Sequence, residues 1–194
     1  MFVELKPNSE YKYSGGGYTV LEMLISDVTK QSFQQYVEKS ILAKLNMHNS
    51  RFDQPINIAK YPNIALGYSN RLPIEGGYFV YPELAAAGMW STAEDIGKFV
   101  IGLQNSIQES PDALLSSNSM RDMLSPYKDS MSGLGIVVDD MYFSHTGHNN
   151  GYVSMMLGHD KKGYGLAILT NAEKPRIISE IIMAVGKRYK WEEF

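Results

Sequence analysis

Residues 145–170 read HTGHNNGYVSMMLGHDKKGYGLAILT, and two apolar runs with a short polar stretch between them dominate this segment. The runs YVSMMLG and YGLAILT are separated by HDKKG, a pattern typical of neighbouring antiparallel strands joined by a turn. Upstream, GLGIVV and MYFSH extend the pattern from Gly133 onward. We therefore predict a β-meander between about residues 133 and 170, with HTG at the end of one strand.

Helical periodicity dominates the rest of the chain. Helices are predicted over residues 18–30, from a capping box at Ser32 and Gln35, from a second box at Ser91 and Glu94, around residues 117–124, and from Pro175 onward. The apolar positions that define their stripes are Leu21, Leu24, Ile25 and Val28; Phe33, Val37, Ile41 and Leu45; Ile96, Phe99, Val100 and Leu103; and Ile178, Ile181, Ile182, Val185 and Tyr189. Helices followed by a sheet and a covering helix predict an α+β fold, in which an antiparallel sheet is flanked by helices.

Composition limits the classes of function. The chain of 194 residues has 44% hydrophobic residues, enough for one domain with a substantial core. A formal net charge of -3 without a Lys/Arg run argues against nucleic-acid binding, and the lack of cysteine excludes thiolate chemistry. No apolar run approaches the roughly 18 residues of a membrane span, and MFVELKPNSE lacks the pattern of a signal peptide.

The stretch YKYSGGGYTV, residues 11–20, admits three interpretations. A phosphate-binding loop would need a Lys and a Ser/Thr after its glycines, and a dinucleotide fingerprint would need spaced glycines after an apolar strand. A flexible linker fits poorly, because a helical stripe begins at once. We expect instead that the glycines allow a tight turn and close approach of a ligand, with Tyr13 and Ser14 facing it.

The segment HTGHNNGY, residues 145–152, supplies the other candidate site. His145 and His148, with His159 as a third ligand, suggest zinc. Their spacing in a Gly/Asn-rich stretch fixes no shared face, and no acidic residue is close in sequence. We predict no metal and no cofactor, and a His-cluster metallohydrolase stays as an alternative.

Taken together, these segments resemble the serine hydrolase superfamily of class C β-lactamases, D-alanyl-D-alanine carboxypeptidases (penicillin-binding proteins) and related esterases. KPNSEYKYSGGGY, residues 6–18, is similar to the family's second motif, a catalytic Tyr, any residue, then usually Asn. YPELAAAGMWSTAEDIGKF, residues 81–99, is similar to its "Ala-Gly-Leu, Ser-Thr, Asp" segment, and HTG to its third motif, Lys/His, Thr/Ser, Gly. The three follow one another in the family's order.

The resemblance implies a role for each matching residue. Tyr13 would be the phenol that assists proton transfer, and Thr146 and Gly147 would line the substrate at a strand edge. The backbone N–H of His148 would donate to the oxyanion. Gly15 stands where the family usually has the Asn that contacts substrate, and His145 stands where β-lactamases have Lys, which favours peptidase-like or esterase-like substrates over β-lactams.

The family's nucleophile motif, Ser-x-x-Lys, precedes its Tyr motif. Only a dozen residues precede Tyr13 here, and although SEYK, Ser9 to Lys12, spells Ser-x-x-Lys directly before it, we expect the family's nucleophile segment to be absent from this chain. The match SPYK, Ser125 to Lys128, is out of order and is predicted to be a surface turn; Tyr68, Ser69 and Asn70 spell the Tyr motif but are predicted to be a loop. We therefore expect residues 1–194 to be a single partial domain, mainly helical over about 1–130 and strands plus a helix over about 131–194, inactive alone.

The resemblance also implies the protein's partners. A small-molecule or peptide substrate is expected, together with either the domain's own N-terminal segment or a homo-oligomer. Proteins of this kind belong to the bacterial cell envelope or are secreted, and nothing in these residues selects a compartment. A non-catalytic peptide-binding module with the same cleft remains the second alternative.

Overall fold

The computed structural model describes residues 3–128 and 130–191. Its α-helices are α1 (Gly15–Thr29), α2 (Phe33–Val37), α3 (Leu84–Ala87), α4 (Ala93–Ile107), α5 (Ser117–Met123) and α6 (Pro175–Tyr189), and a π-helix, η1 (Glu38–Leu42), follows α2. Its strands are β1 (Tyr68–Ser69), β2 (Leu72–Pro73), β3 (Val137–Val138), β4 (Tyr142–Asn149), β5 (Tyr152–His159) and β6 (Gly165–Thr170).

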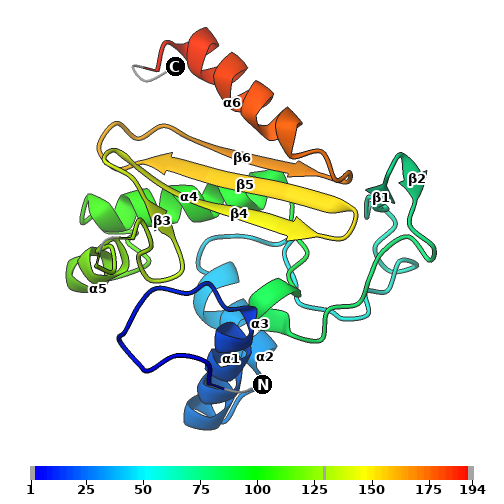
Figure 1. Ribbon diagram of the computed structural model, residues 1–194, viewed down its shortest axis with the longest axis horizontal. Helices are drawn as coiled ribbons and strands as arrows, with labels where there is room; N and C mark the ends of the chain where they lie inside the picture. Colours follow the sequence, from blue (N-terminus) through cyan, green and yellow to red (C-terminus); the bar gives the residue numbers. More distant parts are fainter. Residues whose placement is uncertain (1–2, 129, 192–194) are drawn as a thin grey trace.

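The main sheet has four antiparallel strands in the order β3-β4-β5-β6, so the predicted meander is confirmed. Two residues join β4 to β5, and the second, Gly151, has φ +84°. A glycine suits this left-handed position because it has no Cβ. Helices flank the sheet, which confirms the α+β fold (Figure 1).

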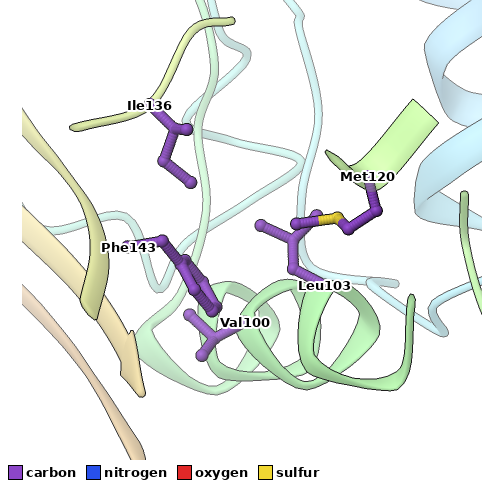
Figure 2. Packing of buried hydrophobic residues seen from close by; sticks show 5 residues of the cluster. All are labelled: Val100, Leu103, Met120, Ile136 and Phe143. Carbon is purple, nitrogen blue, oxygen red and sulfur yellow. The ribbon is translucent and has the colours of Figure 1, made fainter. Parts of the chain in front are cut away.

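The sheet separates two apolar layers. On one face, Phe143 of β4 packs with Val100 and Leu103 of α4 and with Met120 and Ile136, as Figure 2 shows. On the other face, Val153 and Ile168 pack with Ile178 of α6. Side chains alternate between the faces of a strand, so residues 143, 145, 147 and 149 share the α4 face of β4, whereas residues 144, 146 and 148 point the other way.

Two helix starts differ from the expectation. Helix α1 begins at Gly15, because Ser14 is its N-cap and its Oγ accepts a hydrogen bond from the N–H of Gly17 at 3.0 Å. The three glycines therefore form the first helical turn, and the expected tight turn is wrong. Helix α4 is capped by Thr92, which accepts from the N–H of Asp95 at 3.2 Å; the predicted box at Ser91 and Glu94 is wrong because the Ser91 hydroxyl pairs with that of Ser50 at 2.8 Å.

Other elements refine the expectations. The capping box at Ser32 and Gln35 is confirmed, and α6 has Pro175 in its first turn as predicted. Only Val137–Val138 of GLGIVV is a strand, and β4 extends through HTG to Asn149 instead of ending there. The segment predicted as a loop at Tyr68 contains the short strand β1, followed by a turn in which Asn70 and Arg71 have positive φ.

Helix α1 has no buried residue, although its sequence is apolar. Its exposed apolar side chains are Tyr18, Val20, Leu21, Met23, Leu24 and Val28. Among the helices of the described residues, none has the length and apolarity required to cross a membrane.

Candidate active site

A cavity of about 830 Å³ lies where β4 and β5 meet α3 and the loops on either side of the β1–β2 hairpin. Its lining includes Tyr13 together with His145, Thr146, Gly147 and His148, which are far away in sequence. Gly15 is not among the described residues that line it. The structure thus brings five of the six predicted site residues to one cavity.

Tyr13 is held by its place at the start of α1. It directly precedes the N-cap Ser14, whose backbone is extended, with φ -149° and ψ 107°. Helix α1 is fixed to α3, because the Glu22 Oε2 accepts a hydrogen bond from the N–H of Ala85 at 2.9 Å. Gly15 faces the same helix, since a Cβ on it would lie 3.9 Å from that of Ala86. Tyr13 itself is 69% exposed, so its side chain is accessible to a ligand.

The part of β4 that carries HTG is open on one side. Strand β3 pairs only with Phe143 and Ser144 of β4, whereas β5 pairs with the whole of it. Residues 145–149 therefore leave the backbone groups of one edge available for an added extended chain. Gly147 faces Ser154 of β5, and a Cβ on it would lie 2.3 Å from the Ser154 hydroxyl, so a larger residue would disturb this wall of the cavity.

His145 is half-buried, and burial lowers the pKa of its imidazole below the ordinary 6.5. The ring is therefore neutral at pH 7, and it offers a ligand a hydrogen bond where Lys would offer a permanent charge. Thr146 and His148 are exposed and lie on the opposite face of the strand.

The histidines do not converge. His145 and His148 occupy opposite faces of β4, while His159 is buried and its Nδ1 accepts hydrogen bonds from the N–H groups of Lys161 at 3.0 Å and Lys162 at 3.3 Å. Among the described residues, no three His, Asp or Glu side chains are grouped so as to hold a metal ion.

Sequence reasoning missed the residues that fix the end of β4. The Asn149 side-chain amide donates to the Ala87 carbonyl at 3.0 Å, and the Asn150 N–H donates to the Tyr81 hydroxyl at 3.0 Å. Tyr152 donates to the carbonyls of Ala65 at 3.0 Å and Gly77 at 3.2 Å, and burial raises the pKa of its phenol to about 12. The polar residues after HTG were the signal that could have indicated these hydrogen bonds. The residues that they contact are distant in sequence, so the signal did not identify the partners.

Glu173 forms hydrogen bonds with both the β4–β5 turn and β1. Its Oε1 accepts from the N–H of Gly151 at 3.0 Å and its Oε2 accepts from the Ser69 hydroxyl at 2.6 Å. These hydrogen bonds, from Ser69 above all, lower the pKa of the Glu173 carboxyl. One carboxylate thus joins the β4–β5 turn to β1.

Asp95 holds the loop that leads into the cavity. Its side chain is fully buried, and its Oδ2 accepts from the N–H of Asn49 at 2.8 Å and the hydroxyl of Ser50 at 2.9 Å. Lys98 donates to its Oδ1 at 3.0 Å. Burial alone would raise the pKa of Asp95, but the hydrogen bonds from Lys98, Ser50 and Asn49 bring it below its ordinary value.

Ser125 and Lys128 do not act on one another. The Ser125 hydroxyl donates to the Arg121 carbonyl at 2.7 Å, and Lys128 donates to the carbonyls of Asn8 at 2.6 Å and Ser9 at 2.9 Å. Both residues are exposed and neither lines the cavity. This arrangement agrees with a surface turn.

Known proteins resemble both the sequence and the fold. Residues 3–180 match the family described as Beta-lactamase. Protein flp of Staphylococcus aureus is 26% identical over 196 residues, covering 95% of this chain and 39% of that protein. The putative penicillin-binding protein PbpX of Bacillus subtilis is 26% identical over 160 residues, covering 82% of this chain and 39% of its own length. The chain therefore spans about two fifths of the curated relatives it matches.

Solved structures share the fold, among them the following two. D-amino acid amidase from Ochrobactrum anthropi SV3 superposes with a TM-score of 0.75 at 20% identity, covering 96% of this chain and 60% of that one. The octameric penicillin-binding protein homologue from Pyrococcus abyssi superposes with a TM-score of 0.73 at 22% identity, covering 93% of this chain and 43% of that one. With the family match over residues 3–180 and the antiparallel sheet flanked by helices, the chain belongs to the Beta-lactamase family, within the superfamily of β-lactamases and penicillin-binding serine hydrolases.

Proposed function

We propose that these residues form the C-terminal part of a serine hydrolase that transfers an acyl group from a peptide, amide, β-lactam or ester. The observation that carries this proposal is the cavity, which is lined by Tyr13 from the start of α1 and by His145, Thr146, Gly147 and His148 from β4. These positions match two motifs of the family in sequence, and their shared place at one cavity supports the proposal.

In the proposed reaction, a Ser hydroxyl attacks the substrate carbonyl while a Lys takes its proton. The Ser Oγ–carbon bond forms, the bond to the leaving group breaks, and Tyr13 passes the proton to the departing atom. The backbone N–H of His148 is one donor to the oxyanion. Water then attacks the acyl-enzyme and releases the acid. The substrate chain runs along the open edge of β4, beside Gly147.

The nucleophile and its Lys are proposed to lie before residue 1 in a longer protein. Within the 194 residues, Ser9 to Lys12 and Ser125 to Lys128 both spell Ser-x-x-Lys, and none of these four residues lines the cavity. The Lys12 ammonium is paired with Glu4. The chain alone is therefore expected to bind substrate without turning it over. The neutral His145 favours peptide, amide or ester substrates over β-lactams, since it offers no permanent charge for a carboxylate.

A peptide-binding module without catalysis is the second candidate. It is favoured by Gly15, which packs against α3 where the family usually has an Asn that contacts substrate. Binding of a D-alanyl-D-alanine peptide by the longer protein, without any turnover, would support this alternative.

The test compares Tyr13→Phe with the matched control Tyr11→Phe in the longer protein. Tyr11 is also exposed, at 47%, but it does not line the cavity. Turnover of a chromogenic ester and of a D-alanyl amide is measured. Loss of general acid–base assistance should lower kcat for Tyr13→Phe by roughly 100-fold or more, with KM nearly unchanged, while Tyr11→Phe keeps wild-type turnover. Equal activity of the two variants would refute the role of Tyr13.

A further inference from the structure

The charged residues that line the cavity are all basic. Arg51 and Lys60, both on the segment between η1 and β1, contribute permanent positive charges to the lining. No Asp or Glu of the described residues lines it. Since His145 is neutral at pH 7, these two side chains set the charge that a ligand meets.

Arg51 is held firmly at this place. Its backbone forms a two-hydrogen-bond bridge with Trp90, at 2.9 and 2.8 Å. Its guanidinium carbon lies 3.7 Å from the centre of the Tyr61 ring, a cation–π contact. Such a contact uses the charge of the group but not its N–H donors, which can still bind an oxyanion. No ion pair with an acidic residue is found for Arg51 within residues 3–128 and 130–191.

Lys60 shares the same aromatic ring. Its Nζ lies 5.0 Å from the centre of Tyr61. The Tyr61 hydroxyl, and then the charge of Asp53, raise the pKa of Lys60, while Arg51 opposes them. Asp53 is the acidic residue whose charge acts on Lys60, and its Oδ1 accepts from the Gln34 side chain at 3.0 Å; no ion pair joins it to either cation in the described part of the chain.

Two like charges beside one ring, with no ion pair to a carboxylate in the described part of the chain, create a positive potential that attracts an anion. We propose that Arg51, Lys60 and Tyr61 form an oxyanion-binding subsite, which takes a carboxylate or phosphate group of a ligand whose apolar part fills the cavity. This subsite lies on a different element from HTG, so it adds a second point of recognition. The subsite deepens the proposed function, because it lies in the same cavity, and it rests on that function only to this extent. Anion binding at the subsite requires no nucleophile, so it can be tested without catalysis.

The test measures binding of four matched probes to the 194-residue chain by NMR titration at pH 7. Phenylacetate and phenyl phosphate carry an oxyanion, phenylacetamide is neutral, and phenethylamine is cationic. We expect at least one of the two anions to bind about fivefold more tightly than the amide and the amine, with the preference falling as salt increases. The relative affinities of phenylacetate and phenyl phosphate distinguish the two ligand chemistries.

Single and double variants test whether Arg51 and Lys60 cause the preference for anions. Arg51→Gln and Lys60→Gln should each reduce the ratio of anion to amide binding, and the double variant should abolish it. Lys44→Gln is the matched control, since Lys44 is exposed near the start of the same segment and does not line the cavity. Thermal unfolding followed by circular dichroism confirms that each variant is folded.

Three results would overturn the proposal: no binding of either anion at about 10 mM, equal or tighter binding of the amide or the amine, or an anion preference that survives in the double variant. Each concerns recognition alone. Failure of the acyl-transfer proposal would appear separately, as absence of turnover in the longer protein while the anion preference persists.

Discussion

His145 shows at the scale of one residue how position changes chemistry. The imidazole lies on the α4 face of β4, where burial lowers its pKa. At pH values just below 6.5 the unfolded chain therefore binds more protons at this residue than the folded chain does. The neutral ring fits a site that recognises ligands by hydrogen bonds at β4 and by charge at Arg51.

We predict that the free energy of unfolding decreases as the pH falls below about 6.5, and that part of this decrease disappears in His145→Gln. The exposed His48→Gln is the control and should keep the wild-type slope. Asp95 and Glu173 have lowered pKa values, so their contributions are lost only at more acidic pH. Urea unfolding between pH 5 and 7.5 measures the slopes; identical slopes for His145→Gln and wild type would contradict the prediction.

Gly147 is predicted to matter because it has no side chain. In Gly147→Ala the new methyl would meet the Ser154 hydroxyl, and overpacking of this kind costs about 1 kcal/mol of stability. Adding Ser154→Ala should restore the stability but leave turnover in the longer protein low, because the methyl still borders the cavity. Ser154→Ala alone is the control. Recovery of both stability and turnover in the double variant would show that the glycine serves packing only.

The sequence predicted Tyr13 and the HTG residues of the cavity because their order along the chain matches known motifs. It did not predict Arg51, Asn149 or Tyr152. Arg51 contacts Tyr61 and Trp90, Asn149 contacts Ala87, and Tyr152 contacts Ala65 and Gly77. These are tertiary contacts, and no local pattern in the sequence encodes them.

At the scale of elements, periodicity predicted β5, β6 and α6 well, since each has an apolar pattern and a turn or Pro at its boundary. Caps were harder to place. Two hydroxyl residues, Ser91 and Thr92, precede α4, and only the contact of Ser91 with Ser50 decides which one caps the helix. The three glycines at the start of α1 disfavour helix in isolation, so the first turn of α1 was missed. The π-helix η1 has no sequence signal that we know.

Asp95 joins two elements, and its removal tests that junction. Asp95→Ala would leave the buried hydroxyl of Ser50 and the N–H of Asn49 without their acceptor. The expected loss of stability is about 3 kcal/mol. Glu94→Ala is the matched control, because the Glu94 side chain is 74% exposed and pairs with the same Lys98. Chemical denaturation compares the two; equal stabilities would contradict a structural role for Asp95.

At the scale of the whole molecule, the apolar surface of α1 is exposed and would be more stable if another segment buried it. We propose that the segment before residue 1 covers it in the longer protein, and therefore predict that the 194-residue chain self-associates. Val28→Lys, at a side chain that is 74% exposed, should weaken association, whereas Ile101→Lys, 55% exposed on α4, should not. Light scattering over a range of concentrations measures this; a monomer at all concentrations, with no exposed apolar surface detected by dye binding, would count against it.

The proposed division of the catalytic groups is tested most directly by intact mass spectrometry after incubation with a fluorophosphonate. Without its Ser-x-x-Lys segment, the 194-residue chain should acquire no adduct, whereas the longer protein should acquire one, on a Ser before residue 1, and Tyr13→Phe should slow its formation. A stable adduct mapped to Ser9, Ser14, Ser69 or Ser125 of the 194-residue chain would place the nucleophile inside these residues and contradict the proposal.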